Sequence, residues 1–177
     1  MNTKTATAEI MLPDGDEWIS SIKEKAFENM KRYDGCAQVI VDAFMQELDI
    51  YDPLVMRSAT GFLGGMLSSY TCGVQVAGMM VLGLLIGREN IKEGLDGVFP
   101  IAIPGQDLIR RLNSRIGSHS CRELTGVDFT DLNQALAFHA SKEHEKCFKR
   151  VADGAEEIAL FINELKQKGE LFRPNNS

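Results

Sequence analysis

Four cysteines, Cys36, Cys72, Cys121 and Cys147, are the residues of this chain whose side chains are best suited to chemistry. The first three are predicted to stand where helices begin, because residues that cap helix N-termini precede them, namely Asp34, Thr71 and Ser120. A thiol in the first turn of a helix lies at the positive end of the helix dipole, which favours the thiolate form. Because thiolates attack disulfides and bind soft metals, this placement predicts a functional sulfur site.

The spacing of the cysteines restricts the kinds of site that they can form. Successive cysteines are 36, 49 and 26 residues apart, which excludes the local Cys-x-x-Cys motifs of thioredoxin-like enzymes, zinc ribbons and bacterial ferredoxins. No Cys-x-x-Cys-His occurs, so covalent c-type haem attachment is excluded. Tertiary structure would have to bring the sulfurs together. Four thiolates suit an iron–sulfur cluster or zinc, two thiols suit disulfide exchange, and isolated cysteines would be small buried hydrophobic residues.

Several charged or titratable residues lie near the cysteines in sequence. His119 is a candidate ligand or proton donor two residues before Cys121, although a histidine in a surface loop would have the same setting. Arg122 is a candidate for stabilising the Cys121 thiolate, although a solvated arginine at a helix start is equally ordinary. His139 and His144 are close to Cys147 in sequence, and both are expected to face solvent rather than bind a metal.

Composition and charge are those of an ordinary globular chain, with 44% apolar residues, 25% charged residues and a net charge of −6. We expect a single domain over residues 16–170, a flexible N-terminus over 1–15 and a loose tail over 171–177. No long run of Lys or Arg occurs, so no nucleic-acid partner is expected. The first residues show no apolar signal segment and no twin arginine, which predicts a cytoplasmic location. Cysteines are normally reduced there, which favours metal-binding or redox roles over a disulfide framework.

The elements that must position these cysteines are predicted to be helices. Apolar residues recur three and four positions apart, capping residues recur, and alternation typical of strands is scarce. The predicted class is therefore all-α, a helical bundle. The expected helices cover residues 16–33, 35–48, a stretch starting at 52, 72–87, 106–116, 121–126, 130–140 and 141–169. Residues 89–105 are expected to form a loop, because they contain three glycines and two prolines. Cys147 lies on the apolar face of the last helix.

Residues 58–87 contain no charged side chain, which raises the question of a membrane span. Polar residues 68–71 divide the segment, and the remaining 15 residues from Gly73 to Gly87 are short for a span and include Gln75. A helix that is apolar on all sides is also found at the centre of helical bundles. We therefore predict a buried, glycine-rich central helix and no membrane insertion.

The order of these motifs resembles that of the C_GCAxxG_C_C family. The matching segments are Cys36-Ala37-Gln38-Val39, the glycine-rich stretch 59–66, Thr71-Cys72-Gly73, Cys121-Arg122-Glu123-Leu124-Thr125-Gly126, and Cys147. The resemblance covers approximately residues 27–166. The family's Cys-Gly-Ala-x-x-Gly box reads Cys72-Gly73-Val74-Gln75-Val76-Ala77 here, with a glycine one position later at Gly78.

The resemblance implies a redox protein of anaerobic metabolism. A related domain occurs in a dimeric cytochrome that carries both haem and an iron–sulfur cluster. By that resemblance we expect an iron–sulfur cluster, with 2Fe-2S as one form, held by Cys36, Cys72, Cys121 and Cys147. We also expect a homodimer, an unidentified redox partner protein and a role in electron transfer. The alternatives are a thiol–disulfide oxidoreductase and a zinc-stabilised or metal-free helical interaction module.

Overall fold

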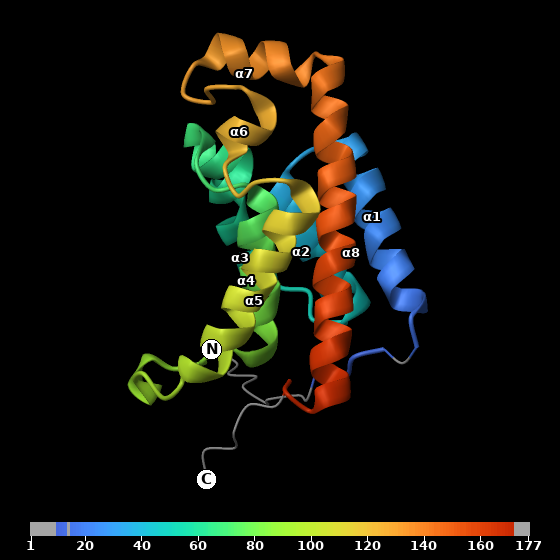
Figure 1. The fold of residues 1–177 in the computed structure, drawn as a ribbon, viewed down its shortest axis with the longest axis vertical. Helices are drawn as coiled ribbons and strands as arrows, with labels where there is room; N and C mark the ends of the chain where they lie inside the picture. The colour runs from blue at the N-terminus through green and yellow to red at the C-terminus, as the bar shows by residue number, and fades with distance from the viewer. Residues whose placement is uncertain (1–9, 14, 172–177) are drawn as a thin grey trace.

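The computed structural model describes residues 10–13 and 15–171, and this part of the chain is almost entirely helical (Figure 1). The α-helices are α1 (Glu17–Tyr33), α2 (Cys36–Glu47), α3 (Pro53–Ala59), α4 (Gly73–Ile86), α5 (Phe99–Ile116), α6 (Cys121–Thr125), α7 (Leu132–His139) and α8 (Glu145–Lys168). Four shorter turns are η1 (Thr60–Phe62), η2 (Gly65–Ser69), η3 (Ile91–Glu93) and η4 (Lys142–His144). The prediction of an all-α fold is confirmed. Most of the expected flexible N-terminus and loose tail lies outside the described residues.

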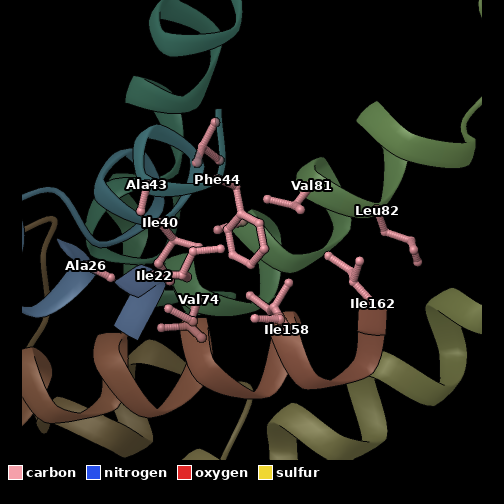
Figure 2. Packing of buried hydrophobic residues seen from close by; sticks show 14 of the residues in the cluster. Ile22, Ala26, Ile40, Ala43, Phe44, Val74, Val81, Leu82, Ile158 and Ile162 are labelled. Carbon is pink, nitrogen blue, oxygen red and sulfur yellow. The ribbon is translucent and has the colours of Figure 1, made fainter. Parts of the chain in front are cut away.

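The two long helices α1 and α8 lie side by side and cover one side of the bundle (Figure 1). Each has an apolar stripe with the three- and four-residue spacing that places side chains on one helical face. Ile22 and Ala26 of α1, together with Ile158 and Ile162 of α8, belong to one core that also contains Phe44 of α2 (Figure 2). The predicted inward stripe of the last helix is therefore confirmed.

Helix α4 lies at the centre of the bundle, packed against α2, α5 and α8. Its side chains Val74, Val81 and Leu82 are buried in the core (Figure 2). The one strongly polar side chain on this helix, Gln75, is also buried and donates a hydrogen bond to Asn113 Oδ1 of α5 at 2.9 Å. Among the described residues, no helix has the length and apolar character that crossing a membrane requires. The prediction of a buried, glycine-rich central helix is confirmed.

The prediction of a loop over residues 89–105 was wrong for its second half. Helix α5 already begins at Phe99, and η3 forms a short turn earlier in the same region. Pro100 lies in the first turn of α5, where backbone N–H groups have no helical acceptor and a proline therefore costs nothing. Pro104 lies inside the helix, where it removes one hydrogen bond. Pro100 is therefore consistent with a helix start rather than with a loop.

Helix starts were predicted well where a capping side chain is present. Asp52 Oδ1 accepts a hydrogen bond from Leu54 N–H at 2.7 Å at the start of α3, and Ser120 Oγ accepts one from Glu123 N–H at 3.2 Å at the start of α6. The helix expected over residues 130–140 is α7, and its cap is Asp131, because the Asp131 carboxylate accepts hydrogen bonds from the N–H groups of the first turn.

Candidate functional site

All four cysteines line one cavity of about 290 Å³. They reach it from four segments that are remote in sequence. Cys36 is the first residue of α2, Cys72 immediately precedes α4, Cys121 is the first residue of α6, and Cys147 lies in the first turn of α8. Cys72 and Cys121 are 8% and 7% exposed, and the other two are partly buried. None of the four forms a disulfide. The fold therefore brings the predicted sulfur residues to a single region.

Cys36 and the start of α4 are in very close contact. A Cβ atom added to Gly73 would overlap Cys36 Sγ, and it would also lie 3.0 Å from Ala37 N and 3.2 Å from Phe62 O. Only a residue without a side chain allows this approach. Gly73, which follows Cys72, is therefore required because Cys36 lies so close to it.

A pair of backbone hydrogen bonds holds Cys72 beside Cys121. Cys72 N–H donates to His119 O at 2.7 Å, and Cys121 N–H donates to Tyr70 O at 2.6 Å. These bonds flank an isolated antiparallel bridge between Thr71 and Ser120. Two cysteines that are 49 residues apart in sequence are thus fixed next to each other by the backbone itself.

The wall of the cavity between α3 and α4 is a left-handed turn. Gly64, Gly65, Met66 and Leu67 have φ angles of 53°, 63°, 59° and 55°. A left-handed conformation costs a residue with a side chain about 1–3 kcal/mol, and such residues concentrate at functional sites. At Gly65 a Cβ atom would lie 2.6 Å from Cys121 Cβ, so this position requires glycine for space as well as for conformation. The backbone N–H of Gly64 is hydrogen-bonded to the Cys36 sulfur.

Ser69 anchors the end of this turn to a remote loop. Its buried hydroxyl donates to Val127 O at 2.9 Å and accepts from Phe129 N–H at 2.7 Å. Gly64 packs closely against the Phe129 ring, 3.0 Å from where its Cβ would lie. The contacts of Ser69 and Gly64 show how the surrounding structure holds the turn in its unfavourable conformation.

Burial controls the protonation of the thiols. It raises the pKa of Cys36, Cys72 and Cys121 to about 12 each, and the proximity of the other cysteines adds to the effect. Burial also raises the pKa of Cys147, while Arg150 opposes the shift. The expectation that helix starts favour thiolates was therefore wrong for the protein without a bound metal. The reason is that desolvation outweighs the helix dipole and the local N–H donors.

These raised pKa values predict that the metal-free protein loses stability in alkali. Above the ordinary thiol pKa of 9.0 the cysteines of the unfolded chain lose their protons, whereas three of the folded thiols keep theirs until the pH approaches about 12. The folded state then binds more protons, so its stability falls as the pH rises through this window. Urea unfolding under anaerobic, metal-free conditions measures the effect, and Cys121→Ala should show a shallower loss. Equal slopes for the two proteins would contradict the assignment.

The other residues singled out in the sequence have separate positions. His119 is exposed, and its backbone carbonyl is the part of it that contacts Cys72. Arg122 forms an ion pair with Asp128 at 2.8 Å, away from the Cys121 sulfur. The cation that approaches a thiol is Arg150, whose Nη1 lies 4.0 Å from Cys147 Sγ. Sequence reasoning missed Arg150, although a spacing of three residues on a helix predicts such a contact.

The expectation that both histidines face solvent is confirmed for His139, which is exposed, and was wrong for His144. His144 is buried, and both imidazoles meet the carboxylate of Asp34 at the edge of the same cavity. Aromatic rings around His144 keep water away from it, which the sequence spacing did not indicate. Asp34 was considered in the sequence only as a helix cap, whereas Gly35 is the residue at that position in the structure.

The arrangement of sulfurs decides which kinds of group the cavity suits. Among the described residues, no three cysteine sulfurs lie within 4.8 Å of one another, whereas donor atoms of Asp34, His139 and His144 do. A single zinc ion needs all its sulfurs about 2.3 Å from the metal and so close to one another. The cysteine arrangement as it stands is too open for one ion, and the ligation of a cluster by these residues stays a prediction.

Comparison with known proteins places the chain in a family. The family model described as "Putative redox-active protein (C_GCAxxG_C_C)" matches residues 35–160, a range that includes all four cysteines. No curated protein and no solved structure matches the chain. Because the matched range covers well over half of the sequence, the chain belongs to the C_GCAxxG_C_C family.

Proposed function

We propose that this protein transfers electrons through an iron–sulfur cluster held by Cys36, Cys72, Cys121 and Cys147. The observation that carries the proposal is that four cysteines from four distant segments line one cavity. Thiolate sulfur is the ligand of iron–sulfur clusters, and a cluster distributes its ligands over more than one iron. An open arrangement of sulfurs around a cavity suits such a group better than it suits one ion.

The chain's own residues would bind and orient such a group. Backbone N–H groups of Ala37, Gly64 and Val74 are hydrogen-bonded to the sulfurs of Cys36 and Cys72. The guanidinium of Arg150 places a positive charge beside Cys147. Such hydrogen bonds and charges stabilise thiolate ligands and set the reduction potential of a cluster. When bound, an iron–sulfur cluster supplies a centre that is reduced and reoxidised by one electron.

Protonation links cluster loading to the solution pH. Without a metal, the thiols of Cys36, Cys72 and Cys121 are protonated at neutral pH, because burial raises the pKa of each to about 12. Ligation of iron requires thiolates, so loading releases these protons. A free thiolate is therefore unfavourable in this cavity. The thiolate form becomes favourable only when positively charged iron is bound.

Disulfide exchange is the second candidate function. It is favoured by the close approach of Cys36 to the start of α4 beside Cys72, which places two reduced thiols in one cavity. Against it, an attacking thiol needs an appreciable thiolate fraction, and both residues have a pKa of about 12. Electron transfer through a cluster is therefore the preferred proposal.

A homodimer and a redox partner protein belong to the same proposal, as the resemblance implies. A surface is available for an interaction of this kind. Ile91, Leu95, Phe99 and Ile103 are spaced four residues apart around the start of α5, and each is well over half exposed. Exposed apolar side chains that are close in sequence are candidates for an interaction surface.

The test is the ultraviolet–visible spectrum of the protein purified without oxygen, together with iron and acid-labile sulfide assays. We expect visible absorption, with iron and sulfide bound in comparable amounts. A colourless, iron-free protein that still exchanges disulfides would make the thiol enzyme the better interpretation. Stoichiometric zinc with sulfur neighbours and no redox activity would instead support a structural metal at the cysteines.

A further inference from the structure

Asp34, His139 and His144 form a compact cluster of a different chemical kind from the cysteines. Asp34 Oδ2 lies 2.8 Å from His139 Nδ1 and 3.5 Å from His144 Nε2. The two imidazole centroids are 4.6 Å apart, and one donor atom from each of the three residues lies within 4.8 Å of the others. The residues come from the α1–α2 connection, the end of α7 and η4. Three separate segments thus deliver a carboxylate and two imidazoles to one point.

The histidine rings are fixed in place by aromatic neighbours. The ring of His144 packs edge-on against Phe138 at 5.2 Å and against Phe148 at 5.0 Å between centroids, and the residue is 8% exposed. His139 packs against Phe129 at 6.1 Å. Side chains that are held rigidly before binding lose little conformational entropy when they ligate an ion. The two imidazoles are therefore preorganised.

The backbone of Asp34 is strained in a way that presents its carboxylate. Its φ and ψ angles are 60° and −176°, a region that is almost restricted to glycine and costs about 1–3 kcal/mol for other residues. Gly35 N–H donates to Asp34 Oδ1 at 2.6 Å, which orients the carboxylate. The other oxygen, Oδ2, is the one that faces both histidines. Strain at a residue that points a ligand atom into a cluster indicates a functional constraint.

We propose that Asp34, His139 and His144 bind a divalent first-row transition metal such as Zn²⁺ at the edge of the cysteine cavity. Two histidines and one carboxylate form the ligand set of open zinc sites and of non-haem ferrous sites. Three protein ligands leave a coordination position for water or a small anion. The site is distinct from the cysteine site, because its donors are nitrogen and oxygen, and it does not depend on the proposed iron–sulfur function.

The same three residues line the cavity that the four cysteines line, so the metal would share a wall with the thiol site. A second, more open depression is also lined by Asp34, His139 and His144. The cluster thus lies where the two hollows meet, and an exchangeable ligand on the metal would be reached through the more open one.

The test is zinc binding by the full-length protein, measured by calorimetry under anaerobic conditions and by X-ray absorption of the bound zinc. We expect one zinc ion per chain in this site, with nitrogen and oxygen neighbours at about 2.0–2.2 Å. Loss of a ligand in His139→Gln or Asp34→Asn should weaken binding by roughly 100-fold or more. His119→Gln is the matched control, because His119 is exposed and lies outside the cluster, and its affinity should equal that of the wild type.

Two further comparisons separate the loss of a zinc ligand from misfolding and from effects at the cysteine site. His139 is partly exposed, so its variant should fold even where substitution of the buried His144 does not. Cys72→Ser should retain this zinc site, which separates it from any effect on iron. Equal zinc affinity in wild type and His139→Gln, or sulfur neighbours around the bound zinc, would overturn the proposal. In those cases the three side chains form only a hydrogen-bonded cluster.

Discussion

Serine in place of Cys72 or Cys121 is expected to leave the anaerobically purified protein without visible absorption and without bound iron. Both thiols are buried, and backbone hydrogen bonds hold the two residues next to each other. Nearby residues of the same chain therefore cannot easily move in to supply a substitute ligand. A serine hydroxyl is a hard oxygen donor and a poor replacement for a soft thiolate. A cluster that loses one ligand should be absent or badly destabilised.

The four single variants distinguish the two redox mechanisms. Cys147→Ser and Cys36→Ser are expected to behave in the same way as the first two, because a cluster uses every ligand. A dithiol enzyme needs one attacking and one resolving cysteine, so two of the four variants would keep activity. Helix content measured by far-ultraviolet circular dichroism is the control for folding. Iron content at the wild-type level in any two of the variants would rule out four-cysteine ligation.

Alanine at Gly73 is expected to destabilise the fold by about 1–3 kcal/mol, the usual effect of inserting a side chain into packed structure. The added Cβ would overlap the Cys36 sulfur and crowd the backbone of Ala37 and Phe62. Because backbone atoms cannot move aside as a flexible side chain can, Cys36 or the start of α4 must shift. The variant should therefore lose bound iron as well as stability.

Gly83 provides the matched control on the same helix. A Cβ atom there would meet nothing within 4 Å, so Gly83→Ala introduces no clash. Alanine has a higher helix propensity than glycine, and the expected gain in stability is about 0.5–1 kcal/mol. Urea unfolding of both variants, with iron content, measures the difference. A Gly73→Ala protein as stable and as iron-rich as Gly83→Ala would show that the close packing at Cys36 is unimportant.

Most of the helices could be predicted from signals that are local in the sequence. The apolar stripes of α1 and α8 and the caps at Asp52 and Ser120 act within a few residues, so their effect can be predicted from the sequence. The early start of α5 was missed, because glycine and proline were interpreted as loop formers although Pro100 fits a first helical turn.

The cysteines could be identified as candidates because residue type and helix-start position are local properties. That they face one cavity depends on how α2, α4, α6 and α8 pack, which spacing alone does not determine. The protonation of the thiols was predicted with the wrong sign for the same reason, since burial is a property of the whole fold. Asp34 and His144 interact although they are 110 positions apart in sequence, and no local sequence pattern indicates this interaction.

The remoteness of the cysteines also sets an order of events during biosynthesis. Cys36 and Cys147 are 111 residues apart, and the left-handed turn beside them is held by contacts from Ser69 to Val127 and Phe129. A ribosome makes the chain from its N-terminus, so the first two cysteines emerge long before the segments that complete the cavity wall. Any group that requires all four sulfurs can only be inserted after α8 has been made and docked.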